Sequence, residues 1–110
     1  MHYNPAGYSS GRSVIRSFSD HGTEDVFNQR RTKAARGTCP EQLWRVAQRK
    51  LDQLNAAVSL ASLRIPPGNH LEALGKDRQG QHSIRINDQY RVCFVWTEEG
   101  PEWVEITDYH

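Results

Sequence analysis

The stretch HSIRINDQYRVCFVWTEEGPEWVEIT, residues 82–107, decides the fold of this chain. Its three runs 82–86, 90–96 and 103–107 alternate apolar and polar residues, which is typical of strands with one buried face. Asparagine, aspartate, glutamate, glycine and proline separate the runs as turn residues. Because such short connections join neighbouring antiparallel strands, the stretch predicts a meander.

The residues before the meander predict a strand followed by a helix. Residues 14–18 have the β-branched and aromatic character of a short strand. Either Ser19 or Thr23 is expected to cap the helix, because a short hydroxyl side chain satisfies the free backbone donors at a helix start. This helix is expected to reach about Arg30.

A second, longer helix is predicted after a basic linker at residues 31–39. Pro40 fits its first helical position, where no backbone donor is needed. A strand, two helices and then at least three strands predict an α+β fold, with the N-terminal strand and the helices packed on a mainly antiparallel sheet. The apolar residues of the second helix recur at steps of three and four: Leu43, Val46, Ala47, Leu51, Leu54 and Val58.

Length and composition indicate one soluble domain. The chain has 110 residues, of which 1–13 are read as a flexible, dispensable leader and 14–110 as the domain. No apolar run approaches the roughly 20 residues that cross a bilayer, and no secretory signal begins the chain. Two distant cysteines provide no disulfide framework, so a cytoplasmic protein without membrane contact is expected.

The charges are unevenly distributed. Residues 1–50 hold nine Lys/Arg against four Asp/Glu, whereas residues 51–110 hold five against nine, although the whole chain has a net charge of +1. A basic half can bind phosphates, because the local field matters more than the total charge. Charge alone still favours a solvated surface for the basic residues between 30 and 36.

Polar groups gathered by the meander could catalyse RNA cleavage. Arg85 and Arg91 lie on neighbouring predicted strands, Lys76 and Arg78 precede them, and 108–110 follow the last strand. Cleavage without a metal needs a base for the 2′-hydroxyl, cations for the phosphate and an acid for the leaving oxygen. An equally good interpretation from the residues alone makes the two strand arginines solvent-facing partners of Glu105 or Asp88. The histidines are scattered, so neither a metal nor a cofactor is expected.

Several stretches resemble the HigB-like toxins of the RelE/ParE superfamily, and together they cover residues 14–110. They are VIRSF (14–18), PPGNHLEAL (66–74), DRQGQHSIRINDQYRVCF (77–94) and EITDYH (105–110). The resemblance implies a RelE-like single domain and cleavage of messenger RNA in the decoding site of the small ribosomal subunit. It also implies a HigA-type antitoxin, through which the toxin would reach operator DNA.

The resemblance also assigns site residues. It places Asp108, Tyr109 and His110 in the active site and makes Arg91 a phosphate contact. Glu72 stands where some relatives have a histidine, so the proton-transfer partner of the terminal histidine is Glu72, the terminal aspartate or a ribosomal group. The predicted RNA and phosphate contacts are Arg85, Lys76, Arg78, Arg36 and Lys33.

Two other functions fit the same residues. In the first, a ParE-like protein poisons DNA gyrase and cuts no RNA, although the terminal Asp-Tyr-His and the two strand arginines argue against it. In the second, the chain is a non-enzymatic module that joins an antitoxin at operator DNA, with the basic segment 30–36 as its contact.

Overall fold

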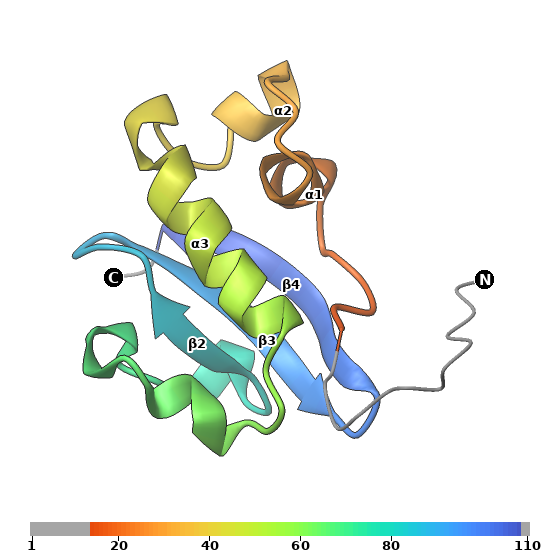
Figure 1. The fold of residues 1–110 in the computed structure, drawn as a ribbon, viewed down its shortest axis with the longest axis vertical. Helices are drawn as coiled ribbons and strands as arrows, with labels where there is room; N and C mark the ends of the chain where they lie inside the picture. The colour runs from red at the N-terminus through yellow and green to blue at the C-terminus, as the bar shows by residue number, and fades with distance from the viewer. Residues whose placement is uncertain (1–13, 109–110) are drawn as a thin grey trace.

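The computed structural model describes residues 14–108, so the predicted leader and the last two residues lie outside the described part. The meander is confirmed, and a two-residue strand, β1, pairs with its first strand. The antiparallel sheet has the order β1-β2-β3-β4 (Figure 1). Its strands are β1 (Glu72–Ala73), β2 (His82–Arg85), β3 (Tyr90–Thr97) and β4 (Gly100–Asp108).

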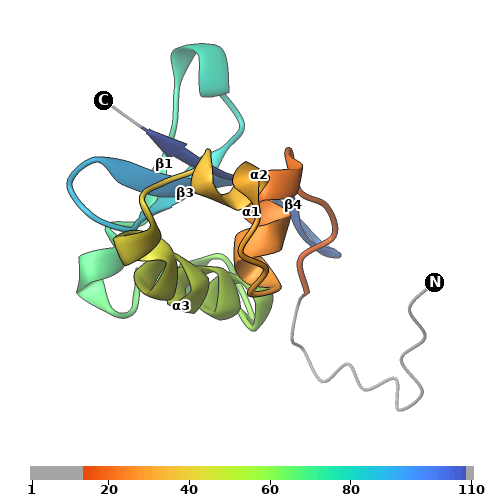
Figure 2. The same cartoon turned by 90° about the horizontal axis from the view of Figure 1, so that it is seen from above.

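The helices cover one face of this sheet, which confirms the predicted α+β class. They are α1 (His21–Phe27), α2 (Lys33–Arg36) and α3 (Trp44–Asn55). Short 3₁₀ turns lie between these elements, at Glu41–Leu43, Ala61–Arg64, Pro67–Asn69 and Lys76–Arg78. Figure 2 shows α3 on one side of the sheet and the turn after β1 on the other.

The first helix starts at a different cap from the predicted ones. Asp20, rather than Ser19 or Thr23, is the N-cap, and its Oδ1 accepts a hydrogen bond from the Thr23 backbone N–H at 2.6 Å. The helix ends at Phe27, three residues before the predicted end at Arg30. Aspartate serves as well as serine at this position, and its charge also suits the positive end of the helix.

The predicted basic linker contains a helical turn, α2. Thr32 is its N-cap, with Oγ1 accepting from the Ala35 backbone N–H at 3.0 Å. The Thr32 hydroxyl also donates to Asp25 Oδ2 at 2.7 Å, which ties α2 to α1. The linker prediction was wrong because these local caps outweigh the absence of an apolar repeat.

The longest helix supplies the centre of the core. Ala47, Leu51 and Leu54 are fully buried against β2, β3 and β4, so the predicted apolar stripe is confirmed in this part. The helix ends at Asn55, and Val58 is 62% exposed, which corrects its place in the stripe. The facing residues of the sheet are Ile84, Val92, Phe94, Val104 and Ile106.

The N-terminal segment follows β4 without forming the predicted strand 14–18. It makes one isolated parallel bridge, between Phe18 and Val104. The strand β4 begins at Gly100 instead of 103, and a bulge interrupts its pairing with β3. Trp103 lies at that bulge with φ 54°. This conformation bends β4 and limits the length over which another strand could pair with it.

Candidate active site

Four of the predicted site residues, Glu72, Arg78, Arg85 and Arg91, lie on the sheet face that points away from the helices. Ile84, Val92 and Ile106 point into the core, and the residues that alternate with them point to the opposite face. We call this the charged face. Its members from the strands are Glu72, Ser83, Arg85, Arg91, Cys93, Glu105 and Thr107.

The guanidinium of Arg91 is held in one orientation. Its Nε donates to Ser83 Oγ at 2.7 Å, and its Nη2 donates to the His70 carbonyl at 2.7 Å. The same Nη2 lies 3.6 Å from Glu72 Oε1, and the Arg91 side chain is only 13% exposed. A planar guanidinium held in this way presents its positive charge to the charged face in one orientation, which suits contact with a phosphate.

A second arginine reaches the charged face from the turn after β1. The Nη1 of Arg78 lies 3.2 Å from Glu105 Oε1 and donates to Gln81 Oε1 at 3.0 Å. Its Nη2 donates to Thr107 Oγ1 at 3.3 Å. The loop that carries Arg78 is thereby tied to β4, so this cation and that of Arg91 share one face.

Arg85 and Arg91 stand directly opposite each other on β2 and β3. Opposed like charges on a sheet repel, because their β-carbons are only about 5 Å apart. Arg85 is balanced by Asp88, whose side chain is 94% exposed in the turn. Since an exposed pair contributes about 0–1 kcal/mol, an anion that bridges the two arginines can replace it.

Cys93 lies beneath these charged side chains and is fully buried. Burial raises the pKa of its thiol above the ordinary value of 9.0, whereas the nearby guanidinium groups of Arg78 and Arg91 act in the opposite direction. A buried, protonated thiol is a poor nucleophile. Cys93 therefore packs the site from below.

The end of β4 lies beside the charged face. Asp108 stands opposite Tyr90 and so on the other side of the sheet from Arg91, which stands opposite Thr107. Its Oδ2 accepts from Gln89 Nε2 at 3.0 Å. The predicted active-site residues Tyr109 and His110 lie outside the described residues.

The remaining predicted phosphate contacts lie further out. Lys76 is exposed in the turn after β1, with φ 53°. Lys33 and Arg36 are exposed on α2, where Arg36 lies 3.7 Å from Glu41. The structure does not add these two to the charged face, and of α2 only Ala34 lines the pocket that the segment 105–108 of β4 borders.

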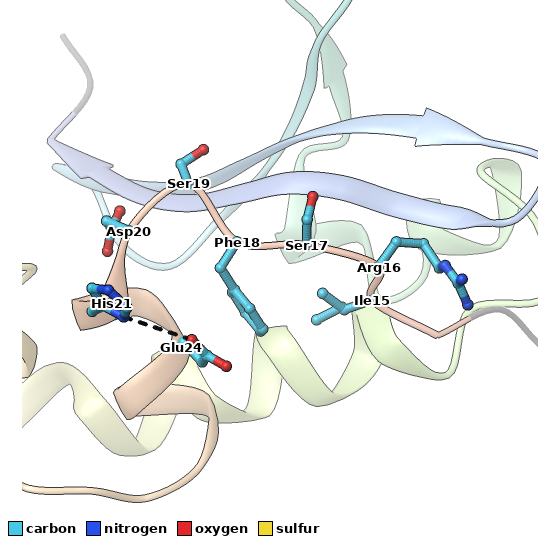
Figure 3. Close-up of a pocket in the computed structure, with 8 residues that line it drawn as sticks. All are labelled: Ile15, Arg16, Ser17, Phe18, Ser19, Asp20, His21 and Glu24. Atoms are coloured by element: carbon cyan, nitrogen blue, oxygen red, sulfur yellow. Dashed lines mark ion pairs between the residues drawn. The ribbon is translucent and has the colours of Figure 1, made fainter. Parts of the chain in front are cut away.

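A second pocket carries none of the predicted site residues. It lies between the N-terminal segment and α1, and an ion pair between His21 and Glu24 crosses its edge at 4.0 Å (Figure 3). Within residues 14–108, no group of three His, Cys, Asp or Glu side chains is arranged to hold a metal ion. None of the described helices combines the length and the apolar character that a membrane span requires.

Comparison with known proteins identifies the family. A family model described as RelE-like toxin of type II toxin-antitoxin system HigB matches residues 16–110. The chain belongs to the HigB-like toxin family.

Two relatives resemble this HigB-like chain over a little more than half of its length. Toxin HigB-1 of Vibrio cholerae is 44% identical over 59 residues, which are 54% of this chain and 62% of that protein. An uncharacterized protein of Haemophilus influenzae is 41% identical over 63 residues, which are 57% of this chain and 60% of that protein. The chain therefore spans about three fifths of the length of these curated relatives.

Sequence reasoning missed the supports of Arg91 in this HigB-like toxin. The Ser83 hydroxyl had a signal, since Ser83 alternates with the apolar Ile84 and so shares a face with Arg91. The His70 carbonyl had none, because its direction depends on a left-handed backbone, with φ 46° and ψ 55°. Such a contact follows from the path of the loop and not from a side-chain pattern.

Proposed function

We propose that this chain is a ribosome-dependent messenger RNA endonuclease that a HigA-type antitoxin neutralises. The family membership supports the class of protein. The observation that carries the activity is the fixed guanidinium of Arg91 standing opposite Arg85 on the charged face. Two cations so placed suit a phosphodiester whose charge grows during cleavage, because donors fixed in advance need no reorganisation in the transition state.

Each predicted residue takes a role in this proposal. Arg91 holds the scissile phosphate with Arg85, and the cations of Arg78 and Lys76 extend the contact along the RNA. His110 exchanges a proton with the substrate, with Glu72, Asp108 or a ribosomal group as its partner, and Tyr109 belongs to the same site. Lys33 and Arg36 hold phosphates further along the strand.

The exposed position of the carboxylate explains why the ribosome is needed. The side chain of Glu72 is 51% exposed and lies on Arg91, so water competes for it in the free protein. Holding the RNA in line with such a group supplies a large part of catalysis, because it removes the entropy of alignment. In this proposal the decoding site supplies that alignment, and the toxin acts in the cytoplasm without a metal or cofactor.

The test is cleavage of messenger RNA on purified, programmed ribosomes. Wild-type protein is expected to cut only in the presence of ribosomes and to leave a 2′,3′-cyclic or 3′-phosphate end. The His110→Ala variant is expected to lose this activity. Addition of a HigA-type antitoxin to the wild-type reaction is expected to stop it.

Two outcomes would favour the other functions. A folded wild-type protein that cuts no RNA but produces gyrase-dependent DNA breaks would support the ParE-like function. A protein that does neither, and only joins its antitoxin on operator DNA, would support the non-enzymatic module. Cleavage that survives the combined loss of His110 and Arg91 would remove both residues from the site.

A further inference from the structure

A polar residue with no assigned role is fully buried beside α3. Asn69 has 0% exposure, and its side chain takes part in several hydrogen bonds. Its Oδ1 accepts from Lys50 Nζ at 2.6 Å, and its Nδ2 donates to Gln53 Oε1 at 3.0 Å. Nδ2 also donates to the Leu63 carbonyl at 3.0 Å. The Asn69 amide therefore clamps the loop before β1 to the helix.

The next residue in the chain connects this clamp to the charged face. His70 has a left-handed backbone, and its carbonyl accepts from Arg91 Nη2 at 2.7 Å. Glu72, two residues further on, contacts the same nitrogen at 3.6 Å. Two contacts of the Arg91 guanidinium thus come from a short segment whose start is fixed by Asn69.

We propose that Asn69, anchored to α3 through Lys50, is a positioning residue that sets the orientation of the Arg91 guanidinium. This inference rests on the proposed endonuclease function and names a further residue for it. Asn69 touches no substrate and acts through the His70 carbonyl and Glu72. The network runs from a rigid helix to the reacting face, so a loop without regular structure can hold a cation in place.

The directional character of the clamp explains the choice of asparagine. A buried amide is costly unless its donors and acceptor are paired, whereas an apolar side chain would fill the space without fixing the loop. Pairing at both ends of the amide determines where the loop leaves the helix. A shift of about 1 Å at a reacting group can cost up to a hundredfold in rate, so fixing the path of this loop should have a measurable effect on the cleavage rate.

The first experiment separates the cleavage step from binding on programmed ribosomes. For Asn69→Ala we expect the single-turnover rate of messenger RNA cleavage to fall about tenfold, with ribosome affinity unchanged within about twofold. Lys50→Met keeps the packing of the helix and should give a smaller loss of the same kind. Loss of affinity with an unchanged cleavage rate would overturn the proposal.

The matched control is Asn55→Ala. Asn55 Oδ1 accepts from the Ile15 backbone N–H at 2.8 Å, so this variant removes another amide tie between α3 and a loop. The segment that Asn55 holds runs beside β4, whereas the segment that contacts Arg91 is the loop before β1. An equal fall in cleavage for Asn55→Ala would show that general loosening causes the effect, which would contradict the proposal.

A double-mutant cycle tests whether Asn69 acts through Arg91. In an Arg91→Ala background, Asn69→Ala should change the remaining cleavage rate by less than about twofold, because residues that act as a unit are not additive. A full tenfold effect in both backgrounds would mean that Asn69 acts by another route.

A spectroscopic measurement distinguishes failure of this inference from failure of the proposed function. In nuclear magnetic resonance spectra, the Arg91 Nε–H that donates to Ser83 should give a separate, slowly exchanging signal in the wild type and in Asn55→Ala. The signal should broaden or move into the envelope of free arginines in Asn69→Ala. If wild type cuts no RNA but this change is seen, the positioning holds and the endonuclease function fails. An unchanged signal would overturn the positioning.

Discussion

The two faces of the same sheet are built in different ways. On the helix side, apolar residues such as Val92 and Phe94 pack directly on α3 and are fully buried. On the charged face, Arg91 is kept in place by a hydroxyl from β2 and by a backbone carbonyl and a carboxylate from the segment 70–72. The apolar face is stabilised by the surface area that it removes from water, whereas the charged face depends on the directions of its hydrogen bonds. We therefore expect substitutions on the first face to affect stability and those on the second to affect activity.

The largest effect should come from breaking the apolar face. Phe94→Ala removes a fully buried ring and should lower the free energy of unfolding by about 3–5 kcal/mol, because it leaves a cavity in the core. Urea unfolding followed by circular dichroism measures this loss. The neighbouring Val95→Ala, at a half-buried position on the side of β3 that carries Arg91, is the control and should cost less than about 1.5 kcal/mol. Equal losses would mean that the two faces do not differ in this way.

A loss of activity without a loss of stability should follow on the other face. Arg91→Ala should slow the cleavage step about a hundredfold, because the cation that offsets the phosphate charge is gone. Arg91→Lys should restore little, since a lysine lacks the planar fork. Single-turnover cleavage on ribosomes, with ribosome binding measured in parallel, tests this. A fall in binding as large as the fall in rate would contradict it.

The buried thiol of Cys93 should make the free energy of unfolding depend on pH. Burial raises the pKa of Cys93 above 9.0, so the folded state keeps its proton where the unfolded chain has lost it. The stabilisation is complete below the unfolded thiol pKa and decreases as the pH rises from there through the raised folded value. Unfolding between pH 7 and 10 should show this decrease, and it should be smaller in Cys93→Ala. An identical slope in the variant would exclude Cys93 as the cause.

The exposed cations of α2, away from the charged face, should contribute weakly to RNA binding. The double variant Lys33→Glu with Arg36→Glu should weaken ribosome association and reduce its salt dependence by about one to two units in the slope of log K against log salt. Cleavage of bound RNA should not change. Arg64→Glu, exposed on the loop after α3, is the matched control. If both variants lower the slope alike, α2 is not a specific contact.

The smallest effect is expected for removal of residues 1–13. A chain that starts at Val14 should unfold at the same urea concentration and cut RNA at the same rate as the full chain. Both measurements use the assays described above. A shortened chain that loses either property would make the leader part of the working protein.

The sequence predicted the apolar face better than the charged one. Alternation at Ile84, Val92 and Ile106 revealed the strands, their faces and the side that the helix covers. It also placed Arg85 and Arg91 together, because their register follows from the turn between them. These properties depend on local periods, which a single sequence contains.

The supports of the charged face could not be predicted in this way. The contact between Arg78 and Glu105 joins residues 27 positions apart through a loop with no periodic pattern. The buried Asn69 lies in the stretch PPGNH (66–70), whose proline and glycine residues are typical of a turn, so no pattern in the sequence marks it. Its role depends on the left-handed backbone that follows it, and that conformation is set by the packing of the loop on α3.

The pairing of the N-terminal segment with the last strand has a consequence for the order in which the chain can fold. The Arg16 N–H donates to the Pro101 carbonyl at 2.8 Å, and the Ser19 N–H donates to the Val104 carbonyl at 2.9 Å. The Gly100 α-carbon also lies so close to Val14 that a β-carbon there would come within 2.1 Å of its carbonyl oxygen. These contacts join the two ends of the described chain, so the N-terminal segment cannot take its final position until β4 is available to pair with it. Closing so long a loop costs conformational entropy, so this segment is expected to settle late in folding.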